Sequence, residues 1–178
     1  LKTLAYLSNV KSIHNQHIVL YLLSMDLKNF FEFNFESLKI FLSQGLEIEK
    51  KKISMRSKQI WQSVYKKGSF EINNLTTFPL ELRSKLNKLI SLERPKILKT
   101  QTSADGTIKW LIKLFDSNEV ECVFIPEKTR ATLCISSQVG CTLNCRFCHT
   151  GTQRLVKNLN FSEIVNQVMI AKEELSDW

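Results

Sequence analysis

The sequence has few glycines and prolines, and it contains no long uninterrupted apolar run. Its 178 residues include only 5 Gly and 3 Pro, while 43% are apolar, which excludes fibrous and low-complexity chains and leaves enough material for a buried core. The longest apolar run near the start, Ile18 to Leu23, is far shorter than the ~20 residues that cross a bilayer. We therefore expect a globular protein with no membrane span and no export signal.

The sequence also lacks the even set of spaced cysteines that forms a structural disulfide framework. The chain has 5 cysteines, an odd number, and three of them lie close together in the sequence. Small secreted domains are instead held by an even set of spaced cysteines. The pattern indicates a cytoplasmic protein whose thiols stay reduced and available to a metal.

Positive charge is abundant, since the formal net charge is +8. One stretch, from Lys50 to Lys67, has seven basic residues and no acidic one, with Trp61 and Tyr65 between them. Basic side chains that neutralise phosphates release counterions, and aromatic rings stack on bases, so this stretch is a candidate RNA contact. The alternative is a solvated helix face whose two aromatic residues belong to the core.

Apolar periodicity predicts helices in the first half of the chain. Ile60, Val64 and their neighbours recur at helical spacing before Gly68, and a second helical stretch opens at Pro79. We interpret residues 35–93 as a helical accessory domain that binds RNA, and residues 1–34 as an unassigned helical extension.

After residue 93 the period changes to that of strands. Apolar residues alternate with lysines from Ile108 to Leu114 and alternate again from Val120 to Phe124, with Asp116-Ser117-Asn118 as a turn between them. Residues 94–130 are therefore predicted to form an antiparallel β-meander, of about three strands, that leads into the next domain.

Residues 131–178 read as a strand, a cysteine-rich loop and a helix. The strand is expected over Thr132 to Val139 and the helix from about Phe161, where Asn160 and Glu163 have capping-box spacing. The predicted buried stripe of that helix is Ile164, Val165, Val168, Met169 and Leu175.

Strand, ligand-rich loop and helix form the first unit of an α/β barrel, whose reactive groups lie at the carboxyl ends of its strands. A complete barrel needs ~250 residues. The predicted fold is therefore α/β: a partial (βα) barrel that stops after its first βα unit, preceded by the helical domain and the short meander. We expect the chain to be the front part of a longer protein.

Three cysteines carry the most specific chemistry. Cys141, Cys145 and Cys148 form a CxxxCxxC motif, and three thiolates on one metal centre leave one position open. An iron-sulfur cluster fits this set. A zinc site would need a fourth ligand, Cys134 or His149, and buried structural cysteines are a third alternative.

The residues around these cysteines resemble a known family. CxxxCxΦC, with Phe147 as the aromatic residue, resembles the radical-SAM signature. The longer segments Thr132–Cys141 and Phe147–Arg154, together with Met55–Trp61 and Ser103–Trp110, resemble the RlmN family of dual-specificity RNA methyltransferases.

This resemblance implies methylation of carbon 2 of an adenine in 23S rRNA and in tRNA. It implies a 4Fe-4S cluster, S-adenosyl-L-methionine and an external electron donor, and we expect a monomer. The family carries the methyl group on a cysteine near its C-terminus, which is absent here. The sequence is therefore expected to be an N-terminal fragment that is inactive by itself.

By matching position, the resemblance gives Cys141, Cys145 and Cys148 as cluster ligands, Cys134 as the cysteine that resolves the protein–RNA adduct, and Glu121 as the proton acceptor at the adenine. Without the resemblance, the residues favour a buried strand position for Cys134 and a solvated strand position for Glu121.

Three alternatives to this function remain from the sequence. One is a zinc-bound RNA-binding module, which would also be basic and rich in cysteine. Another is a different radical-SAM enzyme, and the third is an inactive remnant of the methyltransferase.

Overall fold

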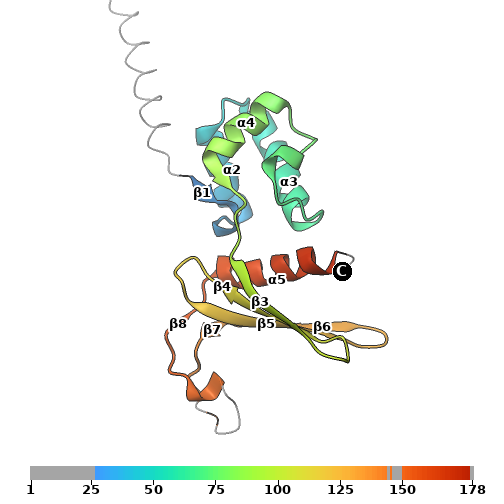
Figure 1. Ribbon diagram of the computed structural model, residues 1–178. Helices are drawn as coiled ribbons and strands as arrows, with labels where there is room; N and C mark the ends of the chain where they lie inside the picture. Colours follow the sequence, from blue (N-terminus) through green and yellow to red (C-terminus); the bar gives the residue numbers. More distant parts are fainter. Residues whose placement is uncertain (1–26, 144, 146–149, 177–178) are drawn as a thin grey trace, which may run out of the picture. The chain divides into compact units, whose positions relative to one another are not determined.

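A computed structural model describes residues 27–143, 145 and 150–176 of the chain (Figure 1). The described residues divide into two compact units, one formed by 27–61 and 71–91, the other by 62–70 and 92–176. None of the described helices is long and apolar enough to cross a membrane. Each unit is described separately below.

The first unit is built mainly from helices. Its elements are β1 (Lys28–Asn29), η1 (Phe30–Glu32), α2 (Phe35–Gly45), α3 (Lys50–Tyr65), η2 (Ile72–Asn74), α4 (Leu80–Leu89) and β2 (Ile90–Ser91), with the last residues of α3 belonging to the second unit. The predicted helices around Ile60 and after Pro79 are confirmed as α3 and α4. Most of the predicted 1–34 extension lies outside the described residues.

Two short strands correct the helical prediction for this unit. Lys28–Asn29 pairs in parallel with Ile90–Ser91, so neither segment is helical. The end of α4 explains why the second segment is a strand. Ile90 is the residue that caps α4: its N–H still donates to the carbonyl of Leu86, but its backbone angles are already extended. Apolar periodicity alone does not distinguish the last helical residue from the first buried strand residue.

The aromatic residue Trp61 belongs to the packing of the first unit. Its ring lies 5.8 Å from that of Phe30 and 5.6 Å from that of Phe35, measured between centroids. Aromatic rings at 4.5–7 Å in tilted or edge-on geometry stabilise each other. The core interpretation of Trp61 is therefore supported over the base-stacking one.

The second unit contains a four-stranded antiparallel sheet in the order β3-β4-β5-β6 (Figure 1). Its strands are β3 (Lys96–Thr102), β4 (Ile108–Lys113), β5 (Glu119–Pro126) and β6 (Ala131–Cys134). The predicted alternation and turns of β4 and β5 are confirmed. The meander has one strand more than predicted, because β6 pairs with β5.

Helix α5 (Phe161–Leu175) packs on one face of this sheet (Figure 1). The shared core contains Trp110, Ile112 and Cys122 from the sheet with Ile170 and Ala171 from the helix. The predicted capping box is present at the start of α5. Four residues of the predicted stripe are only half buried; Met169 is buried, and so are the unpredicted Asn166, Gln167, Ile170 and Ala171.

The predicted strand over Thr132 to Val139 is wrong as one continuous element. It is divided into β6 and the two-residue β7 (Gln138–Val139), which pairs with β8 (Lys157–Asn158). Between them, the Gln167 side chain accepts from the Ser136 N–H at 2.8 Å and donates to the Ser136 carbonyl at 2.9 Å. A side chain of α5 thus replaces a neighbouring strand at this point, which ends the ladder.

Candidate active site

A pocket of about 460 Å³ opens on the face of the sheet opposite α5, next to the cysteine loop, residues 140–156. Sheet residues line one side of it, and residues flanking the first cysteine line the other. Its lining includes Leu111, Glu121, Cys134, Gly140 and Gln153. The pocket therefore brings the two predicted catalytic residues, Glu121 and Cys134, to the residue before the predicted ligand Cys141.

Glu121 lies where strand alternation places it. Its neighbours Val120 and Cys122 are buried, and its own side chain is exposed on the pocket face. The carboxylate forms an ion pair with Lys109 Nζ at 3.0 Å, across neighbouring strands. Both side chains are close to half exposed, so this pair orients the carboxylate but adds little to the free energy of folding.

Cys134 is exposed at the end of β6, so the buried position that its apolar neighbours favour is wrong. Its strand partner is Val123, on the same face as Glu121. Cys122, by contrast, is fully buried in the core. Burial raises the pKa of the Cys122 thiol to about 11, and the Cys134 thiol adds to the effect. Of the two, Cys134 is the accessible thiol.

The described part of the cysteine loop contains two of the three predicted ligands. Cys141 and Cys145 are half buried with free thiols, and the Leu143 N–H donates to Cys141 Sγ at 3.4 Å. Cys148 lies outside the described residues, as do Phe147 and His149. Within the described set, no three His, Cys, Asp or Glu residues are grouped as metal ligands. Two partly accessible soft thiols, one already accepting an N–H, fit an iron-sulfur site.

Two glycines allow the two limbs of this loop, the segment that enters it and the segment that leaves it, to lie close together. Gly140 has φ +75°, and a Cβ there would lie 2.1 Å from the carbonyl oxygen of Arg154. A Cβ on Gly151 would lie 2.7 Å from the carbonyl oxygen of Cys145. Neither approach tolerates a side chain, so both positions require glycine. We did not predict these roles, although a glycine directly before the first cysteine was a visible signal.

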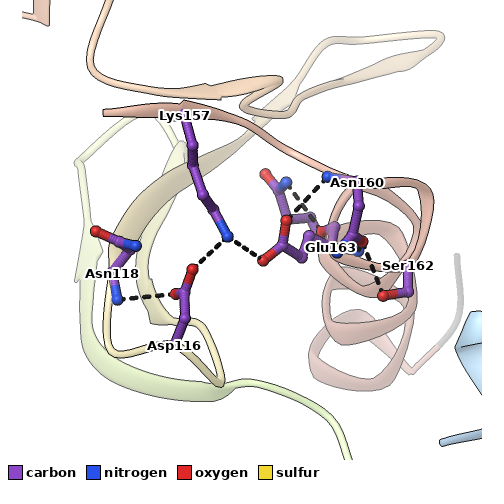
Figure 2. A network of polar contacts seen from close by, with 7 residues as sticks. Asp116, Asn118, Lys157, Asn160, Ser162 and Glu163 are labelled. Atoms are coloured by element: carbon purple, nitrogen blue, oxygen red, sulfur yellow. Dashed lines mark hydrogen bonds and ion pairs between the residues drawn. The ribbon is translucent and has the colours of Figure 1, made fainter. Parts of the chain in front are cut away.

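A charged network fixes the end of the loop (Figure 2). Lys157 Nζ contacts the carboxylate of Asp116, in the turn between β4 and β5, and lies 2.6 Å from Glu163 Oε1, in the first turn of α5. Glu163 also accepts the N–H of Asn160 at 2.9 Å, which closes the capping box. One lysine thus connects the loop, the sheet and the helix.

The network predicts a specific dependence of stability on pH. The Lys157 ammonium, with Asn118, lowers the pKa of Asp116 from 3.8 to about 2. A lowered carboxylate pKa contributes stability above the unfolded pKa, and this contribution is lost as the pH falls through the folded value. For Lys157→Met we expect a loss of about 1–3 kcal/mol in the free energy of unfolding at pH 7, because Asp116 and Glu163 both lose the cation that they share.

This loss is expected to shrink between about pH 4 and pH 2, as Asp116 becomes protonated in the wild type. Urea unfolding of both proteins across this range measures the difference. Lys128→Met, which removes an exposed lysine from the turn after β5, is the matched control and should change stability by less than about 0.5 kcal/mol. A difference that did not depend on pH would contradict the role given to Asp116.

Comparison with known proteins finds relatives in sequence and in fold. No family model matches the chain. The dual-specificity RNA methyltransferase RlmN of Rhodopseudomonas palustris strain BisA53 is 48% identical over 140 residues, which cover 75% of this chain and 35% of the relative. RlmN of Nitrobacter winogradskyi is 48% identical over the same lengths. The chain is related in sequence to the RlmN family.

The fold is similar to that of a solved methyltransferase. A crystal structure of a radical SAM methyltransferase from Sphaerobacter thermophilus superimposes with a TM-score of 0.72 at 28% identity, over 84% of this chain and 43% of that one. The chain spans about a third of the length of the RlmN relatives that it matches. The predicted α/β class is confirmed.

Proposed function

We propose that this chain is part of a radical-SAM methyltransferase that modifies carbon 2 of adenine in 23S rRNA and tRNA. The observation that carries the proposal is the pocket, which is lined by an exposed carboxylate, an exposed thiol and Gly140, the residue before the first cysteine of the CxxxCxxC motif. The relationship to RlmN and the similarity to a radical SAM methyltransferase support it. We place the protein in the cytoplasm, as a monomer served by an external electron donor.

Cys141, Cys145 and Cys148 would hold a 4Fe-4S cluster. Bound there, such a cluster supplies one electron to S-adenosyl-L-methionine and so starts radical chemistry, which the electron-poor carbon 2 requires. The glycine contacts of the loop bring the backbone around Cys145 close to the chain after Cys148 and so restrict where the thiols lie. Residues 131–178 would then open the (βα) barrel that carries the rest of the cofactor site.

Glu121 and Cys134 would act on the substrate. A carboxylate exposed in the pocket is placed to take the proton that leaves carbon 2 as the adenine regains its aromaticity. The Cys134 thiolate would attack the sulfur of a methyl-carrying cysteine, to which none of the five cysteines of this sequence is assigned, and form a disulfide as the methylated base departs. The electron pair of the broken S–C bond would leave with the methylene carbon, which takes up one proton to become the methyl group. The proton of carbon 2 would go to Glu121, and the one electron that the radical adduct loses as it regains aromaticity would return to the oxidised cluster.

The helical unit would contribute to RNA binding through α3. Lys50 and Lys58 of α3 are exposed, as the phosphate-contact interpretation requires. Lys66 and Lys67 are exposed too, but they follow α3 and belong to the second unit. Arg56 differs: it donates to the Thr77 carbonyl at 3.1 Å, and its guanidinium lies 5.3 Å from the centroid of the Phe78 ring. We therefore exclude Arg56 from the contact surface.

Anaerobic reconstitution tests the cluster. The chain loaded with iron and sulfide should bind both in equal amounts and become brown, and Cys141→Ala and Cys145→Ala should each retain at least about tenfold less iron. Cys134→Ala is the matched control, because it removes an exposed cysteine that is not a ligand, and it should load as the wild type does. Tight binding of one zinc with no iron, or loss of the metal in Cys134→Ala, would instead support the zinc module.

A further inference from the structure

Four lysines lie on the pocket face of the sheet, on the two strands away from β6. In β4, Lys109 and Lys113 alternate with the buried Trp110 and Ile112, so their side chains are on the same face as Glu121. In β3, Lys96 pairs with Lys113, and Lys99 pairs with Leu111. Directly paired residues share a face of the sheet.

A register shift makes this arrangement possible. Lys96 and Lys99 are three residues apart, so a regular strand would direct them to opposite faces. The register of β3 shifts between Ile97 and Lys99, and the extra residue returns Lys99 to the face of Lys96. The irregularity therefore gathers the positive charges of two strands on one surface.

These charges are only partly compensated within the protein, because Glu119 of β5 is the one carboxylate of the described residues that stands directly opposite one of the four, Lys113. Lys109 pairs with Glu121. For the other three, Lys96, Lys99 and Lys113, no carboxylate of the described residues lies within the 4.0 Å of an ion pair. Lys96 and Lys113 stand directly opposite each other, and like charges in that position destabilise a sheet. A bound anion would remove this repulsion.

The position of the lysines fits a strand of RNA that enters the pocket. Neighbouring strands are ~4.8 Å apart, so β3 lies ~10 Å from the β5 strand that carries Glu121. We propose that Lys96, Lys99 and Lys113 bind the phosphates of the nucleotides beside the target adenine while its base occupies the pocket. This inference rests on the proposed function, because it names the surface through which that substrate is held.

A salt titration of RNA binding tests the inference. The probe is an RNA hairpin with adenines in its loop, and binding to the full chain is followed by fluorescence anisotropy at several salt concentrations. For Lys99→Gln/Lys113→Gln we expect a salt slope smaller in magnitude by roughly 1.4, since each lost single-strand phosphate contact removes about 0.7. Affinity should fall at least about tenfold at low salt.

Lys39→Gln/Lys85→Gln is the control, because it removes the same net charge from lysines that are already ion-paired with Glu36 and Glu81. Its slope should change less than that of the sheet variant. Equal slopes for the wild type and the sheet variant, or equal losses in both variants, would overturn the inference. The reconstitution experiment contains no RNA and this titration no iron, so failure of the cluster assignment is distinguishable from failure of the phosphate surface.

Discussion

Replacing Gly140 with alanine is expected to separate the two limbs of the cysteine loop and to prevent cluster loading. The new Cβ would lie 2.1 Å from a backbone carbonyl oxygen, and a backbone atom has no rotamer to move into. The residue also has φ +75°, which alone costs a non-glycine residue about 1–3 kcal/mol. We expect a larger loss of unfolding free energy than this range, and roughly tenfold less iron after reconstitution.

Two other glycines separate the effect of the positive φ from the effect of the steric overlap. Gly106 has φ +83°, but a Cβ there meets only the Pro126 side chain at 3.1 Å, so Gly106→Ala should lose stability and still load iron. Gly151 contacts the Cys145 backbone without a positive φ, so Gly151→Ala should impair loading through steric overlap alone. Normal iron content in Gly140→Ala would show that the contact between the limbs is not needed. Urea unfolding and iron analysis provide both measurements.

Truncation of Trp110 is expected to have the largest effect on folding. Its side chain is 1% exposed and lies in the core shared by the sheet and α5. Removing a large aromatic group leaves a cavity that its surroundings fill only in part, so Trp110→Ala should lower the unfolding free energy by about 3–5 kcal/mol. Urea unfolding monitored by circular dichroism measures the loss.

Phe115→Ala is the matched control for Trp110. This phenylalanine follows β4 within a few residues of the tryptophan, but 58% of its surface is exposed. The same kind of truncation should therefore change stability by about 0.5 kcal/mol or less. If both variants lost equal stability, the effect could not be assigned to the core between the sheet and α5.

Features set by neighbouring residues were predictable. The alternation of apolar and polar residues predicted β4 and β5. Asn160 and Glu163, which are three residues apart, predicted the start of α5. In each case the signal and the structure lie within one element, where backbone geometry relates spacing to face. Glu121 was placed on its face by the same rule.

Features set by contacts between distant residues were not predictable. Gln167 ends a strand by bonding Ser136, 31 residues earlier, and Lys157 joins a turn 41 residues before it. No local pattern indicates such partners, because apolar periodicity describes which side chains are buried and not which polar groups meet. The same limit explains Trp61. Its position in a basic stretch suggested a contact with RNA, but the aromatic rings that it packs against, those of Phe30 and Phe35, lie in another segment of the chain.

The hydrogen bonds between the Gln167 side chain and the Ser136 backbone have a consequence for Cys134. Because Gln167 bonds the backbone N–H and carbonyl of Ser136, β6 stops at the cysteine, although the Ser136 hydroxyl still donates to the Glu121 carbonyl of β5 at 2.8 Å. Within the described residues, no strand of this sheet lies beyond β6. The thiol therefore stands at a free margin of the sheet, where a sulfur from another part of the protein can approach it without displacing a neighbouring strand. Thiol exchange depends on such access, so the helix that shortens β6 also keeps the sulfur reachable.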